Sequence, residues 1–95
     1  MQIIYSSRFK KELLQIVNFI KKDSQTRAYS FSYSMKSKIE LISSNPYSYR
    51  KRISSENSDL RELIFKGYTI PFFIDKVDNK IIILGIFNQN LWNEN

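Results

Sequence analysis

The first half of the chain places apolar residues at the spacing of two amphipathic helices. The first stripe comprises Phe9, Leu13, Ile16, Val17 and Ile20, and the second comprises Ala28, Phe31, Met35, Ile39 and Ile42. Ser6 or Ser7 precedes the first stripe and Ser24 precedes the second, as is typical of helix N-caps. Asn45-Pro46 ends the second helix, because the residue before a proline avoids the helical region. The short link between the stripes predicts an antiparallel helical hairpin.

The remaining apolar segments have the length and composition of β-strands. They are Ile3–Tyr5, Leu60–Phe65, Tyr68–Ile74 and Lys80–Phe87. Lys66-Gly67 and Asp78-Asn79 are turn sequences between the last three segments. Pro71 cannot donate a ladder hydrogen bond, so we expect a bulge or an unpaired position beside it.

Residues Tyr47–Asp59 show no periodicity and are rich in serine, so we expect a surface loop there. The predicted order is strand, helix, helix, strand, strand, strand. This order indicates an α+β fold in which the helical hairpin covers one face of a small antiparallel sheet. At 95 residues, the chain is expected to form a single domain over residues 1–95.

Composition restricts the chemistry that the chain can carry. It contains neither cysteine nor histidine, which excludes disulfides, the usual zinc sites and an imidazole acid or base. We therefore expect no metal and no cofactor. The longest apolar run, Ile81–Phe87, is far shorter than the roughly 18–20 residues of a membrane span. With no signal-peptide pattern at the start, the expected location is the cytoplasm.

The charge is unevenly distributed. The net charge is +6, and residues 1–52 hold eleven Lys or Arg against three acids, whereas residues 53–95 hold four against six. A basic half favours an acidic partner, either nucleic acid or an acidic protein segment. The alternative is that these side chains only solvate helix surfaces.

Four segments taken together resemble the RelE/ParE superfamily of toxins. They are Ile4–Leu13, Leu41–Pro46, Leu60–Ile70 and Ile81–Asn90, and they occur in the right order over nearly the whole chain. The resemblance implies a RelE/ParE-like fold and the toxin of a type II toxin–antitoxin pair. It also implies a small, partly disordered antitoxin that neutralises the toxin.

The superfamily divides by target. RelE-like members resemble ribosome-dependent mRNA endonucleases, whereas ParE-like members resemble inhibitors of DNA gyrase that are not nucleases. RNA cleavage requires a proton acceptor, a proton donor and cations. Thr69 stands where the nuclease pattern has an arginine, and the C-terminal segment has no tyrosine. Arg61, Lys66 and Tyr68 are the catalytic candidates if the protein is RelE-like, but the departures favour the ParE-like branch and a protein that is not an enzyme.

The predicted function is therefore growth inhibition through DNA gyrase, with neutralisation by an antitoxin. A ribosome-dependent mRNA endonuclease and a non-toxic binding domain of the same fold remain as alternatives. Residues predicted to bind the antitoxin or the target are Arg8, Lys11, Arg50, Lys51, Arg52, Arg61, Asn88, Gln89, Asn90 and Trp92. Trp92 is included because large apolar groups in polar segments tend to mark interfaces.

Overall fold

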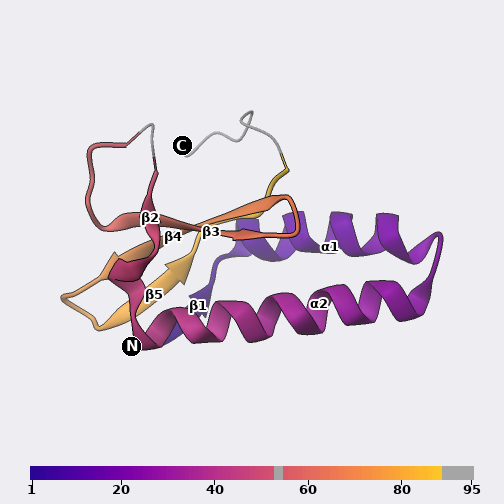
Figure 1. Ribbon diagram of the computed structural model, residues 1–95, viewed down its shortest axis with the longest axis horizontal. Coiled ribbons are helices and arrows are strands. Elements are labelled where there is room, and N and C mark those ends of the chain that lie inside the picture. The colour runs from indigo at the N-terminus through magenta and orange to yellow at the C-terminus, as the bar shows by residue number, and fades with distance from the viewer. Residues whose placement is uncertain (53–54, 89–95) are drawn as a thin grey trace.

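The computed structural model describes residues 1–52 and 55–88. Its elements are β1 (Gln2–Tyr5), α1 (Ser7–Lys21), α2 (Gln25–Glu40), the 3₁₀ turns η1 (Leu41–Ser44) and η2 (Pro46–Ser48), β2 (Arg50–Lys51), β3 (Leu60–Phe65), β4 (Tyr68–Asp75) and β5 (Lys80–Ile83). Figure 1 shows α1 and α2 side by side as a hairpin, which extends beyond the sheet at its connecting turn. The predicted α+β architecture is confirmed.

Serine side chains begin both helices, as the sequence predicts. The Ser6 hydroxyl accepts a hydrogen bond from the backbone N–H of Phe9 at 3.0 Å, and Ser24 does the same for Arg27 at 3.2 Å. These contacts satisfy backbone donors that the first turn of a helix leaves without partners. Ser6 also donates to the carbonyl of Leu84 at 3.1 Å, which ties the start of α1 to the end of β5.

The sheet is mixed and five-stranded, with the order β1-β5-β4-β3-β2. The expectation of a purely antiparallel sheet is wrong at one edge, because β1 lies parallel to β5. The expectation of a loop throughout Tyr47–Asp59 is also wrong, because Arg50 and Lys51 pair antiparallel with β3. A strand of two residues is too short to show a period-2 pattern, and only its partner strand reveals it.

The pairing between β4 and the last part of the chain changes register beside Pro71. Phe72 faces Ile83, whereas Thr69 faces Phe87, so three steps along β4 correspond to four steps along the other strand. The extra residue lies where the missing N–H of Pro71 leaves a gap in the ladder, as expected for a proline in a sheet. At the preceding turn, Lys66 and Gly67 both have positive φ, at 49° and 84°, which suits a two-residue hairpin.

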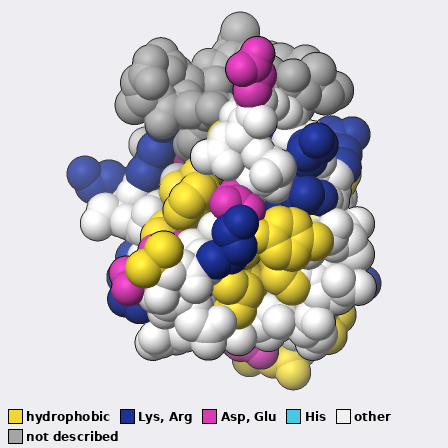
Figure 2. Space-filling model, turned by 90° about the vertical axis from the view of Figure 1, so that its left-hand side faces the viewer, with side chains coloured by type: hydrophobic (Ala, Val, Ile, Leu, Met, Phe, Trp, Pro, Cys, Tyr) yellow, Lys and Arg dark blue, Asp and Glu magenta, His cyan; other side chains and the backbone are white. Residues whose placement is uncertain are grey.

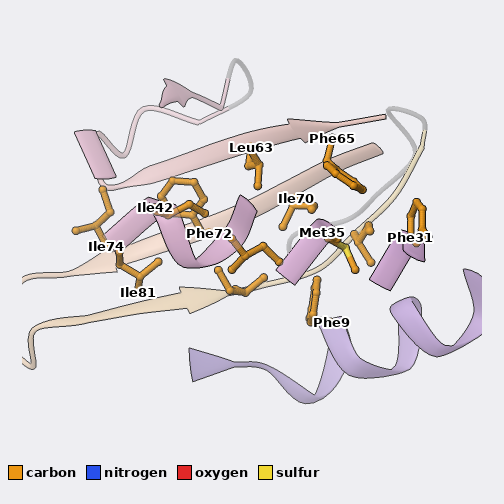
Figure 3. Close-up of a cluster of buried hydrophobic side chains, with 13 residues drawn as sticks. Phe9, Phe31, Met35, Ile42, Leu63, Phe65, Ile70, Phe72, Ile74 and Ile81 are labelled. Atoms are coloured by element: carbon orange, nitrogen blue, oxygen red, sulfur yellow. The ribbon is translucent and has the colours of Figure 1, made fainter. Parts of the chain in front are cut away.

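The core lies between the helical hairpin and one face of the sheet, as Figure 3 shows. Phe9 from α1 and Met35 from α2 are fully buried against side chains of the central strands. The sheet side of the core comprises Leu63, Phe65, Ile70, Phe72, Ile74, Ile81 and Ile83. Ile16 packs against this core only half-buried, and Val17 instead lines a surface groove, so the first stripe is less buried than its periodicity suggests. No helix in the described ranges is both long and apolar enough to span a bilayer.

Candidate functional site

Two of the three cations in the Arg50-Lys51-Arg52 cluster hold a buried carboxylate. Glu62 on β3 is only 5% exposed, and its two oxygens accept from Arg50 Nε at 2.7 Å and from Arg52 Nη1 at 2.9 Å. The Arg52 side chain is 12% exposed, and its guanidinium also lies 5.4 Å from the centre of the Phe87 ring. Lys51 is exposed on the edge strand. These contacts fasten β2 to the sheet, and the carboxylate of Glu62 offsets one of the three positive charges of the predicted basic cluster.

Arg61 also contacts the protein itself. Its Nε donates to the carbonyl of Ser58 at 2.8 Å, and its Nη1 donates to the carbonyls of Tyr47 and Tyr49 at 3.1 and 2.8 Å. The guanidinium carbon lies 5.1 Å from the centre of the Tyr47 ring. The side chain therefore braces the connection from η2 to β2, which is a structural role.

The same end of the molecule carries an exposed polar cluster around Asp59. The Tyr47 hydroxyl donates to Asp59 Oδ1 at 2.7 Å, and Lys76 Nζ lies 3.5 Å from Asp59 Oδ2. The hydrogen bond from Tyr47 lowers the pKa of Asp59, and the same bond raises the pKa of Tyr47. Figure 2 faces this end and shows hydrophobic, basic and acidic side chains intermixed. The surface there does not form a patch of one charge.

The three nuclease candidates do not converge. Arg61 lies opposite Phe72, four residues along β4 from Tyr68, which corresponds to about 13 Å at the usual rise per residue of a strand. Tyr68 makes an edge contact with Phe31, at 5.5 Å between ring centres. Lys66 lies in the β3–β4 turn, with its Nζ 5.4 Å from the centre of the Phe65 ring. Their positions do not assemble the proton-transfer groups and cations that RNA cleavage needs.

A groove runs along the seam between α1 and α2. Two adjoining hollows of about 340 and 410 Å³ share Val17 and Ser32 and together form what we call the hairpin groove. Its apolar walls include Leu14, which is 58% exposed, and Tyr29, which stacks on the neighbouring Tyr33 at 6.4 Å between ring centres. The described lining includes the lysines Lys10, Lys21 and Lys36 and no carboxylate. The hairpin groove is thus apolar with basic margins.

A second groove, of about 390 Å³, lies on the opposite flank of α1, and we call it the α1–β4 groove. It is lined by Glu12, Gln15, Ile16, Phe19, Tyr68, Ile86, Phe87 and Asn88. It brings Tyr68 and Asn88 together, although they are distant in sequence and were predicted for separate reasons. Its far wall is fixed in place by backbone hydrogen bonds between Thr69 and Phe87 at 2.7 and 3.0 Å.

Glu12 anchors the wall of the α1–β4 groove to the helix. Its Oε1 accepts from the backbone N–H of Ile86 at 3.1 Å, and its Oε2 lies 3.4 Å from Arg8 Nε. The single carboxylate of the described lining is therefore engaged by a backbone donor and by a cation. The groove is consequently close to neutral.

The remaining predicted residues have varied positions. Arg8 pairs with Glu12, and Lys11 is exposed on α1, and neither belongs to the described lining of the hairpin groove or of the α1–β4 groove. Gln89, Asn90 and Trp92 lie outside the described residues.

Sequence reasoning missed the apolar side chains that line the two grooves. Leu14 and Phe19 lie off the apolar stripe of α1, and Tyr29 lies off the stripe of α2. Large apolar residues at such off-stripe positions in the sequence could have predicted an exposed apolar surface.

Comparison with known proteins supports the resemblance. A family model described as "ParE toxin of type II toxin-antitoxin system, parDE" matches residues 3–90. A solved structure titled "Chromosomal ParDE TA system from P. aeruginosa" superposes with a TM-score of 0.72 at 17% identity, covering 90% of this chain and 92% of that one. A search of curated protein sequences found no match. Because the family model spans most of the sequence, the chain belongs to the ParE toxin family of type II toxin–antitoxin systems.

Proposed function

We propose that this protein inhibits DNA gyrase and is neutralised by an antitoxin whose amphipathic helix occupies the hairpin groove. The composition of the hairpin groove is the observation that supports this antitoxin site. The groove combines exposed apolar side chains with three lysines and has no carboxylate in its described lining. A large apolar surface with basic margins fits an amphipathic helix that has acidic residues beside its apolar stripe.

Apolar anchors and charges would serve different steps of antitoxin binding. Leu14, Val17 and Tyr29 offer contacts to apolar residues spaced three and four apart on the incoming helix. Lys10, Lys21 and Lys36 would attract its acidic residues during encounter, which mainly accelerates association. Burial of the anchors would hold the complex and set its dissociation rate.

A target other than mRNA is supported by the contacts of three arginines, which bind groups of the protein itself. Arg61 donates to three backbone carbonyls, and Arg50 and Arg52 hold Glu62. The same arginines cannot at once make these contacts and stabilise a phosphorane. Inhibition of a protein target requires no proton transfer, so the absence of that chemistry among the candidate residues favours gyrase over mRNA.

The antitoxin site is tested by replacing an exposed anchor. Leu14→Asp should weaken binding of the cognate antitoxin at least tenfold, measured by calorimetry, because an apolar contact is lost and the new negative charge repels the acidic residues of the antitoxin. Val77→Asp is the matched control, since Val77 is 95% exposed on the β4–β5 turn and far along the chain from either helix. Equal affinities for the Leu14 variant and the wild type would place the antitoxin elsewhere.

The gyrase target is tested with purified components. The toxin should inhibit supercoiling of relaxed plasmid by gyrase, and equimolar antitoxin should restore it. The rival mRNA endonuclease would instead cut mRNA on ribosomes at defined codon positions and leave supercoiling intact. That second result would refute the gyrase proposal.

A further inference from the structure

We infer that the α1–β4 groove is the surface that contacts the target, and that its partner is an uncharged apolar segment of a protein. This inference rests on the proposed function, because it gives the toxin a target surface separate from the antitoxin site. The two grooves lie on opposite flanks of the same helix. Side chains that lie on opposite flanks of a helix cannot contact one apolar stripe of a single partner helix.

The exposed ring of Phe19 is the strongest evidence that the α1–β4 groove binds a partner. Phe19 is 69% exposed although it lies on a helix whose other large apolar residues contribute to the core or to the hairpin groove. The exposed residues Gln15 and Asn88 line the same hollow. An exposed aromatic ring with polar neighbours is typical of the central anchor of a protein interface. The side-chain amides of these two residues suit hydrogen bonds to a peptide backbone.

The charge of the α1–β4 groove excludes a nucleic-acid partner. The described lining contains no lysine or arginine, in a chain that has 15 of them. Its one carboxylate, Glu12, already contacts Arg8 and the N–H of Ile86. Phosphate backbones bind where cations neutralise them, so neither RNA nor DNA has its usual ligands here. A protein segment with an apolar side chain and few charges is the complementary partner.

The proximity of the two grooves explains how one partner would exclude the other. Both grooves use α1, and a helix with its side chains is only about 10–12 Å across. An antitoxin in the hairpin groove would therefore extend next to the α1–β4 groove without filling it. A large target protein that docks on Phe19 would collide with that antitoxin. Neutralisation would follow from steric exclusion and would not require the two partners to compete for the same side chains.

Phe19→Ser tests the inference against the antitoxin site. Because Phe19 is mostly exposed, the variant should fold, and its antitoxin affinity should stay within twofold of wild type. Its concentration for half-inhibition of gyrase supercoiling should rise at least tenfold. Val77→Ser, which removes a similarly exposed apolar side chain from the β4–β5 turn, should change neither value. Unchanged inhibition by the Phe19 variant, or a parallel loss of antitoxin binding, would overturn the inference.

A second experiment distinguishes failure of this inference from failure of the proposed function. The photo-crosslinker p-benzoylphenylalanine is incorporated in place of Phe19, and the purified toxin is illuminated with gyrase in one tube and with ribosomes and mRNA in another. A covalent adduct with a gyrase subunit is the expected result. An adduct with RNA, or no adduct in either tube, would overturn the inference. If wild-type toxin itself fails to inhibit gyrase, the proposed function is refuted before any variant is compared.

Discussion

Replacing Glu62 with alanine should destabilise the fold more than any other single change to a charged residue in the described sheet. Glu62 is nearly buried and accepts from Arg50 and Arg52 at 2.7 and 2.9 Å. Removing one member of a buried ion pair costs about 3–5 kcal/mol, because the remaining charge stays buried without its partner. The ring of Phe87 would offset part of this cost by holding the guanidinium of Arg52, worth about 1 kcal/mol. The expected loss is about 2–4 kcal/mol.

The two arginines should contribute unequally to stability. The arginine with the longer contact to Glu62, Arg52, should contribute more than Arg50. Arg50 has the shorter contact, but its side chain is 58% exposed, so it can be rehydrated and is worth about 0.5–1 kcal/mol. Arg52 is mostly buried and should be worth more. Arg52→Met should therefore cost more than Arg50→Met. The double replacement Glu62→Met with Arg52→Met should recover most of the loss, because an apolar pair of similar volume requires no desolvation of charge.

Urea unfolding followed by circular dichroism measures these differences. For a domain of this size, the loss at Glu62 corresponds to a decrease in Tm on the order of 10–20 °C. A cost below about 1 kcal/mol for Glu62→Ala would show that the carboxylate is not effectively buried. A larger cost for Arg50→Met than for Arg52→Met would show that distance, and not burial, determines their contributions.

Three further predictions concern packing, pH and the β3–β4 turn. Phe9→Ala should cost about 3–5 kcal/mol and Ile16→Ala only about 1–2 kcal/mol in the same urea assay, because Phe9 is fully buried and Ile16 is half-buried; equal costs would contradict the burial described. Tyr47→Phe should be less stable than wild type at about pH 6, and the difference should shrink as the pH is lowered below the ordinary pKa of an aspartate. Because the pKa of Asp59 is lowered, the hydrogen bond from Tyr47 stabilises the protein fully at pH values above the ordinary pKa of an aspartate. This stabilisation is lost as the pH falls through the lowered pKa of Asp59. A stability difference that does not depend on pH would refute this interpretation. Gly67→Ala should lower stability by about 1–2 kcal/mol through backbone strain, since φ is +84° and the added carbon would meet no heavy atom within 4 Å other than those of its own residue and the two chain neighbours. Gly67→Asn should cost less.

The helices could be predicted from the sequence because their signals are local. Ser6 and Ser24 cap α1 and α2 as their positions suggest, and Lys66-Gly67 adopts the positive φ values of a two-residue turn. Pro71 marks the register shift in the sheet. Each of these features depends on residues within a few positions of one another along the chain.

The features that escaped prediction depend on contacts between distant segments. The strand β2 exists because Arg50 and Lys51 meet β3, and a pattern of two residues cannot reveal that. The burial of Glu62 depends on the same register, which places it between two arginines from the adjacent segment. The α1–β4 groove requires the end of the sheet to lie against α1, through a hydrogen bond that spans 74 residues between Glu12 and Ile86. Such pairings are set by tertiary packing, and periodicity does not encode them.

The order in which DNA synthesis and protein synthesis stop in growing cells tests the gyrase target most directly. After induction of the toxin without its antitoxin, DNA and protein synthesis are pulse-labelled separately at short intervals. Inhibition of gyrase predicts that incorporation into DNA falls first, that protein synthesis continues through the early samples, and that mRNA stays intact. Immediate loss of protein synthesis with cleaved mRNA would contradict the gyrase target and favour the nuclease.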